Sequence, residues 1–486
     1  MKAVRKGMDT KMVDKYERMP DAFTFLDGSK VATEADWEKR KEELATLYQQ
    51  HMYGVWRSGE KVDYEELTEV VTGRFTATDW KDFSTWKYVE TSEPATDWKK
   101  SLKIKLQRAD ASVLGQENAE AEFRVNLYLP CVASEAGKSE DTKDVAKKPE
   151  HPDGAPIFIE IGSLGEPVRN YLLSQGYAVA EMRTNEVASD DDKHLGAFYE
   201  LYPYGKTAEE QTGVLMAWAW GVSKIIDVLS MPSLAKKLKL DPKVIIVNGV
   251  SRNGKATAVA GAFDPRITVT APSSSGAGGV VAFRYNSEGL TFDYSPLKKD
   301  EFIDFQGEEE GTASYEGYQT EEGKWVMVTT NQSFTHLGLD SMGGWVIDNY
   351  RKFTDVADFP LDQHLLAALS SGEERYLYIT TEVVGGDWVN AAGTYACYLE
   401  TKKIFERLGL GEHLAAHVHA VGHAFTRLDA EYLVAFCEQK VYKKEDTVYA
   451  ERLQELATNV YEQADNREVF NRVYNKICSV SDSKQI

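Results

Sequence analysis

Cysteine is scarce in this 486-residue chain, and its four cysteines lie far apart. Cys131, Cys397, Cys437 and Cys478 form no C-x-x-C pair and have no spacing typical of a metal site. Their positions therefore exclude a disulfide-dense scaffold and a cysteine-based zinc framework. We expect buried free thiols.

Long apolar runs and an excess of positive charge are also absent. No apolar run reaches the roughly 18 residues of a membrane-spanning helix. The 56 basic and 77 acidic residues give a formal charge of −21, so we expect neither nucleic acid nor an anionic membrane as a partner. Residues 1–20 lack the apolar segment of a signal peptide. We expect a soluble chain in which no signal peptide is visible.

Helix and strand signals begin after about 30 residues. Thr33-Glu34-Ala35-Asp36 has the form of a capping box, and the apolar residues after it are spaced as in a helix, which predicts a helix over residues 34–53. Residues 101–107 and 122–130 alternate between apolar and polar side chains, which indicates half-buried antiparallel strands. Residues 133–155 are charged and rich in proline and glycine, which is typical of a surface loop.

The centre and the C-terminal part of the chain carry continuous apolar segments instead. Such runs indicate strands that are buried on both faces, and the stretches between them have helical spacing. The expected strands are residues 157–163, 177–182, 244–249, 267–272, 375–381 and 415–421, and the expected helices are residues 214–231, 391–408 and 429–442.

This order predicts an α/β fold with a mainly parallel sheet between two layers of helices, preceded by antiparallel strands. We expect an N-terminal extension over residues 1–30 and a single catalytic domain over residues 31–486. Residues 286–324 have no clean period and are rich in glycine, acidic and aromatic residues. We predict that they form an inserted rim or lid of functional importance.

One serine stands where a strand meets a helix. The segment Gly249-Val250-Ser251-Arg252-Asn253-Gly254 resembles the G-x-S-x-G turn of serine hydrolases, but its second glycine comes one place late. Such a turn exposes the serine hydroxyl above a sheet and directs helix N-terminal N–H groups at a developing oxyanion. Ser251 is therefore a candidate nucleophile; the alternative is a serine that only caps a helix.

Several segments resemble one known family. The sequence G-V-S-R-N-G-K at 249–255, followed by A-G-A-F-D-P-R-I and S-S-G-A-G-G, is similar to the nucleophile motif G-C-S-R-x-G-K of the glucuronoyl esterases, carbohydrate esterase family fifteen, and its surroundings. Further similar segments occur before and after this motif in family order, so the resemblance covers roughly residues 30–445. The resemblance implies an α/β-hydrolase fold and makes Ser251 the nucleophile. Val250 replaces the family's cysteine, so the disulfide that some members form there is excluded.

The resemblance also implies roles for residues around Ser251. Arg252 would stabilise the oxyanion and Lys255 would bind sugar hydroxyls, and both roles suit fixed positive charges. Trp345 would stack on the substrate, and Gln332 would take the place of a substrate-binding glutamate. Without the resemblance, the two cations could be surface charges and Trp345 could be a core residue.

The base is expected near the C-terminus. His423 follows a predicted strand and lies in a loop, as the histidine does in the family and in other α/β hydrolases. His417 and His419 alternate within that strand. The three histidines could instead bind zinc, but no carboxylate is spaced to complete such a site. We expect His364 to be structural.

The third member of the triad is displaced relative to many family members. Their glutamate before S-G-A-G-G is Ser274 here, and a serine cannot stabilise an imidazolium. A carboxylate after the next strand must replace it. We favour Asp387, because the spacing from Trp388 to Gly393 is similar to the family pattern after its acid, and keep Glu382 as the alternative acid.

The sequence thus predicts a serine-type carboxylic ester hydrolase that needs no metal and no cofactor. By resemblance, its substrate is an ester of (4-O-methyl)glucuronic acid on xylan, linked to a lignin alcohol. The alternatives are an acetyl-xylan or other carbohydrate esterase with the same triad, and a catalytically weak carbohydrate-binding relative. We expect a monomer, secreted or periplasmic by resemblance.

Overall fold

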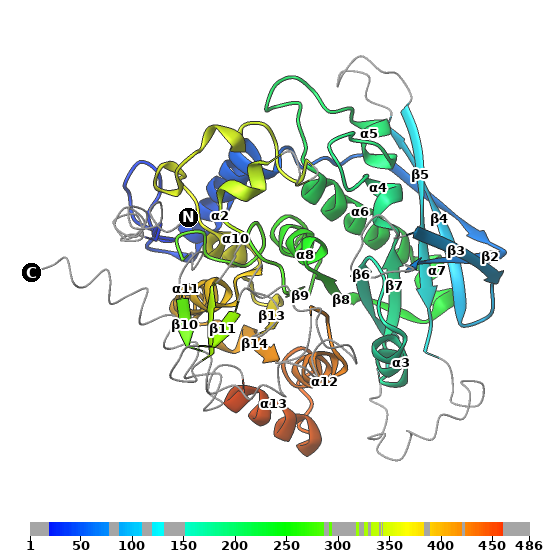
Figure 1. Ribbon diagram of the computed structural model, residues 1–486. Coiled ribbons are helices and arrows are strands. Elements are labelled where there is room, and N and C mark those ends of the chain that lie inside the picture. Colours follow the sequence, from blue (N-terminus) through cyan, green and yellow to red (C-terminus); the bar gives the residue numbers. More distant parts are fainter. Residues whose placement is uncertain are drawn as a thin grey trace, which may run out of the picture.

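A nine-stranded sheet forms the centre of the molecule (Figure 1). The computed structural model describes residues 19–76, 87–108, 119–130, 151–285, 291–293, 317–319, 325–328, 332–339, 342, 344–382, 389–419 and 423–459. The strand order is β1-β4-β5-β7-β6-β8-β9-β13-β14. From β7 to β14 all neighbours pair in parallel, whereas β1, β4, β5 and β7 pair antiparallel. The predicted α/β class is confirmed.

The strands of this sheet are as follows: β1 Lys61–Leu67, β4 Lys99–Arg108, β5 Ala119–Tyr128, β6 Ala155–Ile161, β7 Ala178–Met182, β8 Leu240–Val250, β9 Val269–Ser273, β13 Tyr376–Glu382 and β14 Leu414–His419. Two smaller sheets do not share strand pairing with it: β2 (Glu69–Thr76) with β3 (Lys87–Pro94), and β10 (Thr291–Asp293) with β12 (Trp325–Val328) and β11 (Gly317–Gln319).

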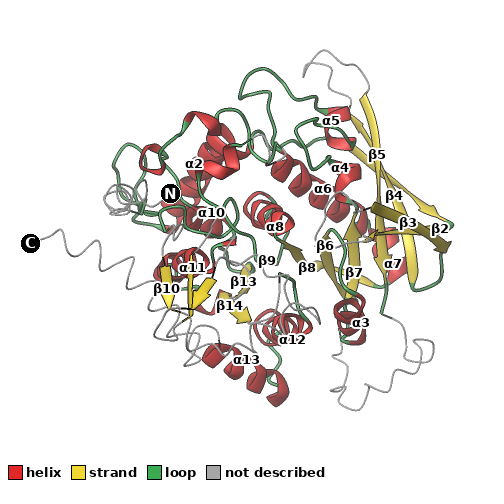
Figure 2. Ribbon diagram, viewed as in Figure 1, coloured by secondary structure: helices red, strands yellow, loops and turns green. Residues whose placement is uncertain are grey.

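Helices cover both faces of the parallel half (Figures 1 and 2). One layer contains α6, α8 and α10, which pack on one another, and the other contains α3, α12 and α13. The helices are α2 Glu34–Tyr48, α3 Glu166–Ser174, α4 Thr184–Val187, α5 Ala197–Leu201, α6 Val214–Leu229, α7 Pro232–Leu238, α8 Arg252–Phe263, α10 Gln363–Leu369, α11 Ala391–Arg407, α12 Arg427–Phe436 and α13 Thr447–Asn459.

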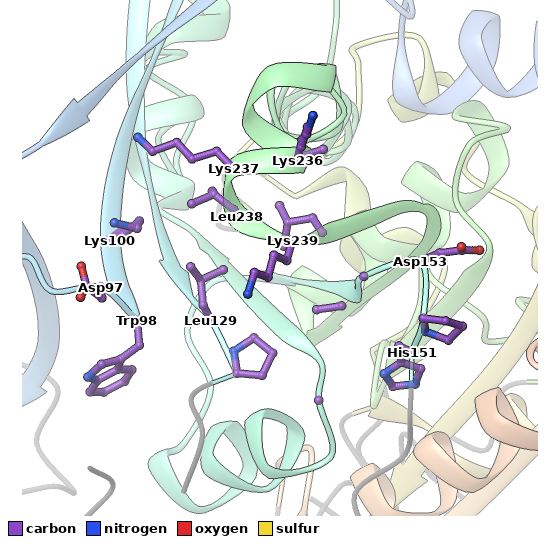
Figure 3. A pocket seen from close by; sticks show the side chains of 17 residues that line it. Asp97, Trp98, Lys100, Leu129, His151, Asp153, Lys236, Lys237, Leu238 and Lys239 are labelled. Atoms are coloured by element: carbon purple, nitrogen blue, oxygen red, sulfur yellow. The ribbon is translucent and has the colours of Figure 1, made fainter. Parts of the chain in front are cut away.

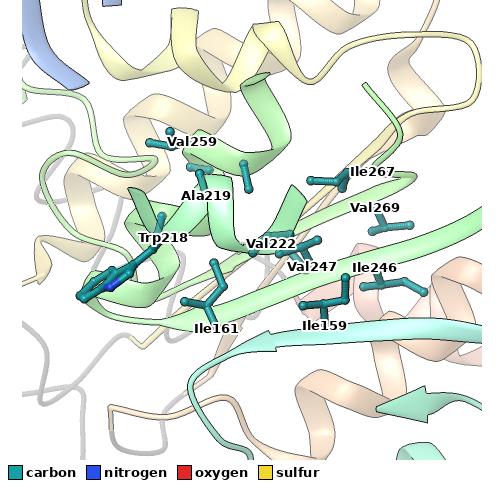
Figure 4. Packing of buried hydrophobic residues seen from close by; sticks show 14 of the residues in the cluster. Ile159, Ile161, Trp218, Ala219, Val222, Ile246, Val247, Val259, Ile267 and Val269 are labelled. Carbon is teal, nitrogen blue, oxygen red and sulfur yellow. The ribbon is translucent and has the colours of Figure 1, made fainter. Parts of the chain in front are cut away.

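Burial explains why the central strands read as unbroken apolar runs. Every residue of β6, β7, β9 and β13 is buried, because helices cover both faces. Helix α6 is buried almost along its whole length. Figure 4 shows Trp218, Ala219 and Val222 of α6 against Ile159 and Ile161 of β6. Each large side chain buried here contributes about 1.5–3 kcal/mol.

Several predicted elements are confirmed, and others were missed. The capping box of Thr33 and Asp36 is present, and its helix continues as a π-helical turn, Gln49–Tyr53. Strands β1, β2 and β3 were not predicted, and their described side chains are mostly exposed or half-buried, so their sequences carry little apolar signal. The predicted insertion 286–324 lies mostly outside the described residues, and its described parts are β10 and β11.

The thiols of Cys397 and Cys437 are free and buried, as predicted, and Cys131 and Cys478 lie outside the described residues. Within the described ranges, no single helix is long and apolar enough to cross a membrane. Helices α6 and α7, which are bent relative to each other, together have the length and apolar composition of a membrane span, but α6 is a core helix.

Candidate active site

Ser251 occupies a strained turn between β8 and α8. Its backbone has φ 62° and ψ −125°, a conformation that side-chain-bearing residues rarely adopt. Its backbone N–H donates to the carbonyl of Ser273 at the end of β9 (3.0 Å), and its carbonyl accepts from the N–H of Lys255 (3.0 Å). The surrounding structure therefore holds the strained residue, as expected for the nucleophile turn of an α/β hydrolase.

The late second glycine of the motif has a steric reason. A Cβ at Gly254 would lie 2.5 Å from the carbonyl oxygen of Ser273, so α8 can cross β9 only if position 254 has no side chain. A Cβ at Gly249 would lie 2.8 Å from the backbone of Asn253. The close approaches fall two residues before and three residues after Ser251, so G-x-S-x-x-G is the pattern that this turn requires.

His423 follows β14 and is paired with a buried carboxylate. Its Nδ1 lies 2.7 Å from Oε1 of Glu382, the last residue of β13. The His423 side chain is 40% exposed, whereas that of Glu382 is fully buried. Burial raises the pKa of Glu382, but hydrogen bonds from His423 and Ser274 and the charge of His419 outweigh it, and the pKa stays below its usual value. Glu382 is thus an ionised acceptor, so Nδ1 donates and Nε2 can accept a proton.

The position of Ser274 explains how the carboxylate of a triad can come from either of two adjacent strands. It follows β9, it has a φ of 42°, and its hydroxyl donates to Oε2 of Glu382. Its N–H donates to the carbonyl of Thr380 on the adjacent strand β13 (2.8 Å). The ends of β9 and β13 are therefore neighbours, and a carboxylate at either end can reach one imidazole. Asp387, the acid favoured from the sequence, lies outside the described residues.

The histidines of β14 have a different partner. Nδ1 of His417 lies 2.5 Å from Oδ1 of Asp429, and Nε2 of His419 lies 3.6 Å from Oδ2 of that residue. Asp429 also forms the capping box of α12 with Thr426. The buried cluster of His417, His419 and Asp429 therefore links α12 to β14. In the part of the chain that the structure describes, no group of three or more His, Cys, Asp or Glu side chains could hold a metal ion.

Lys255 is buried beside the turn of Ser251. Its Nζ donates to Oε1 of Gln332 (2.8 Å) and to the carbonyl of Ser275. A Cβ at Gly276 would lie 2.9 Å from this Nζ, so the glycine makes room for it. Burial, and to a smaller degree the charge of Arg252, lowers the pKa of Lys255 to about 7. A buried amine that is ready to titrate near neutral pH is typical of a functional site.

Asp190 joins two further side chains of the site. Its Oδ1 accepts from Nε1 of Trp345 (2.8 Å), and its Oδ2 pairs with the guanidinium of Arg252. The cations of Arg252 and Lys255 lie 5.9 Å and 5.5 Å from the centre of the Trp345 ring. The structure therefore brings together all four residues predicted around Ser251. Sequence reasoning missed Asp190, which lies in a run of three aspartates that looks like solvated surface.

This arrangement suits nucleophilic acyl transfer. It combines a strained serine, a histidine oriented by a carboxylate and fixed cations. Ser251 follows β8 and His423 follows β14, so both come from the same edge of the parallel strands, where sites in open α/β sheets are usually found.

Comparisons with known proteins identify relatives of this chain. Residues 132–295 match the protein family described as "Glucuronyl esterase, fungi". A multidomain esterase of Ruminococcus flavefaciens is 33% identical over 458 residues, which cover 93% of this chain and 49% of the relative. A 4-O-methyl-glucuronoyl methylesterase of Schizophyllum commune is 24% identical, covering 81% of this chain and 75% of the relative. The chain thus spans about half the length of the first of these relatives.

A solved structure is similar over nearly its whole length. The glucuronoyl esterase of carbohydrate esterase family 15 from Caldicellulosiruptor kristjansonii is 30% identical, with a TM-score of 0.63. The match covers 89% of this chain and 92% of that chain. The fold predicted by resemblance is confirmed.

Proposed function

Because the chain belongs to carbohydrate esterase family 15, the family of glucuronoyl esterases, we propose that it hydrolyses esters of (4-O-methyl)glucuronic acid. The observation that carries this proposal is the buried amine of Lys255 beside the strained Ser251. An esterase for acetyl groups would have little use for such an amine, whereas a sugar acid offers it hydroxyl and carboxyl oxygens.

The proposed reaction has two acyl-transfer steps. His423 Nε2 takes the proton of Ser251, whose oxygen attacks the ester carbonyl, and the same histidine then protonates the departing alcohol. Water, activated by His423, cleaves the resulting acyl-enzyme and releases the uronic acid. Glu382 holds the imidazole through Nδ1 and stabilises its positive charge. We assign this role to Glu382 in place of Asp387, because its carboxylate contacts His423.

The negative charge of the tetrahedral intermediate would be stabilised at the start of α8. We assign this task to the guanidinium of Arg252 together with the backbone N–H groups of the first helical turn. Lys255, Gln332 and Trp345 would hold the sugar, with Lys255 and Gln332 as polar contacts and Trp345 as a flat apolar surface. Asp190 would keep Arg252 and Trp345 in one relative orientation.

A polymeric ester such as glucuronoxylan linked to lignin is met outside the cytoplasm. We therefore propose that the protein acts after export, in the periplasm or the medium. A monomer remains our prediction for its state in solution.

Replacing Lys255 tests the substrate class. Lys255→Met keeps most of the length of the side chain and removes the amine, so KM for benzyl glucuronate should rise about 10- to 100-fold, the cost of a hydrogen bond to a charged group. KM for 4-nitrophenyl acetate should stay nearly constant, because this ester has no sugar to hold. An equal rise for both esters would mean that Lys255 is structural and would remove the basis of the glucuronate assignment.

Product inhibition should depend on pH through the same amine. The pKa of Lys255 is lowered to about 7, so the amine is charged below that pH and neutral above it, while glucuronate remains an anion. The inhibition constant of free glucuronate should therefore increase as pH rises through about 7 and beyond. Lys255→Met should lack this part of the dependence. Parallel pH curves for the two proteins would contradict the prediction.

Asp190 should act through Arg252. Asp190→Asn keeps an acceptor for the indole of Trp345 but removes the charge that pairs with the guanidinium. Because a partly exposed ion pair contributes about 0.2–1 kcal/mol, kcat for the glucuronate ester should fall by up to about fivefold, with little change in KM. Asp190→Ala should also raise KM, because Trp345 loses its acceptor. A rise in KM without a fall in kcat for Asp190→Asn would show that Arg252 is not the group affected.

A further inference from the structure

A second concave site (Figure 3) lies at the start of β8, at the end of that strand opposite Ser251. It is a cavity of about 1190 Å³ where the parallel strands begin, and its wall includes Ala155 at the start of β6 and Leu240 at the start of β8. Ser251 follows the other end of β8, so the two sites are separated by roughly 30 Å. The volume exceeds the range of about 300–1,000 Å³ typical of small-molecule sites. It therefore suits a segment of a polymer better than a single small ligand.

Positive charge gathers at this cavity. Among the residues that the structure describes, its lining includes four lysines, Lys100, Lys236, Lys237 and Lys239, and two acidic residues, Asp97 and Asp153. In the whole chain, acidic residues outnumber basic ones by 21. Lys237 is paired with Glu66. Within the described ranges, the other three lysines have no ion-pair partner. They are therefore available to pair with an anionic ligand.

Two of these lysines frame an aromatic surface. Lys100 extends from β4 two residues after the partly buried Trp98, whose carbonyl accepts from the N–H of Leu129 (2.7 Å). Lys239 ends α7 in the left-handed conformation (φ 54°, ψ 47°), and its carbonyl accepts from the N–H of Ala155 (2.8 Å). In Figure 3, Lys239 lies between the edge formed by Trp98 and Lys100 and the edge formed by His151 and Asp153. The backbone around both lysines is therefore fixed.

We propose that this cavity binds a polysaccharide that carries free uronate groups. Trp98 offers a flat apolar face to a pyranose ring, Lys100 and Lys239 attract uronate carboxylates, and Asp97 and Asp153 accept hydrogen bonds from sugar hydroxyls. The choice of a uronate polymer rests on the proposed function, since the same polymer carries the ester. A site far from Ser251 would retain the protein on the polymer after each ester is cleaved.

Binding of de-esterified 4-O-methylglucuronoxylan to the full chain, measured by affinity electrophoresis or calorimetry, tests the proposal. Lys100→Glu/Lys239→Glu should weaken binding about tenfold, because two attractions become repulsions. The matched control is Lys402→Glu/Lys403→Glu on the exposed face of α11, which changes the net charge equally. This control should bind like the unmodified chain, and unsubstituted xylan should bind weakly to all three proteins.

Turnover of benzyl glucuronate separates this proposal from the proposed function. The cavity variant and the control should hydrolyse this small ester at the unmodified rate, since Ser251 is distant. Failure of the unmodified chain to hydrolyse it would overturn the esterase function, whereas polymer binding would still report on the cavity. Equal loss of binding in both double variants, or unchanged binding in the cavity variant, would overturn the cavity site. If the charge reversal does not fold, Lys100→Gln/Lys239→Asn should weaken binding about threefold, and no loss in that variant would equally overturn it.

Discussion

Ser251→Ala should reduce turnover of a glucuronate ester by a factor on the order of 10⁶, the loss seen when a serine hydrolase loses its nucleophile. The methyl group cannot attack the carbonyl, and no second hydroxyl takes part in the proposed mechanism. The measurement is kcat for benzyl glucuronate with purified protein. A variant that keeps more than a few per cent of the activity would exclude Ser251 as the nucleophile.

The fold should tolerate this change. The hydrogen bonds that hold the turn use the backbone N–H and carbonyl of residue 251, and alanine has the same Cβ as serine at φ 62°. The midpoint of thermal unfolding should therefore stay close to that of the unmodified chain. Ser251→Gly should be as inactive but more stable by about 1 kcal/mol, because glycine adopts a positive φ without strain. A less stable glycine variant would show that the turn is not strained.

Glu382→Gln should reduce kcat on the order of 10⁴, the effect expected when the carboxylate that orients a catalytic histidine becomes an amide. The amide group of glutamine can donate to Nδ1 of His423, which would leave the proton on Nε2 and remove the base. KM should change little, because Glu382 is buried beneath the histidine and does not meet the sugar. The loss should be visible with both glucuronate and acetate esters.

Asp387→Asn is the matched control, since Asp387 is the competing candidate for the acid. We expect a small loss there. The reverse order of the two effects would return the role to Asp387. Adding Ser274→Glu to Glu382→Gln should restore part of the activity, because the hydroxyl of Ser274 already touches the carboxylate of Glu382. No recovery in a folded double variant would show that the end of β9 cannot present a carboxylate to this imidazole.

Local signals in the sequence located much of the fold and the site. Continuous apolar runs identified β6, β7, β8 and β9, since burial on both faces leaves a mark in each strand. The strand-to-helix transition predicted Ser251 as the candidate nucleophile, and the loop after β14 predicted His423 as the candidate base. The resemblance to glucuronoyl esterases supplied Arg252, Lys255, Trp345 and Gln332, and these four side chains do lie together.

The remaining features depend on contacts between distant segments. The ends of β9 and β13 are neighbours although Ser274 and Glu382 are 108 positions apart, so no local spacing could show which carboxylate meets His423. Asp190 is likewise 62 positions from Arg252, and two further aspartates follow it in the chain. The exposed strands β1 to β3 were missed because their pairing, and not burial, defines them.

The ratio of kcat/KM for benzyl glucuronate to kcat/KM for 4-nitrophenyl acetate tests the central claim most directly. Both esters need the same triad, and 4-nitrophenolate is a much better leaving group than benzyl alkoxide, but only the glucuronate ester offers a sugar to Lys255, Gln332 and Trp345. We predict that the glucuronate ester is preferred by at least about tenfold, the value of one well-placed hydrogen bond to a charged group. A ratio near one, or a preference for the acetate, would contradict a glucuronoyl esterase and favour a general carbohydrate esterase on the same fold.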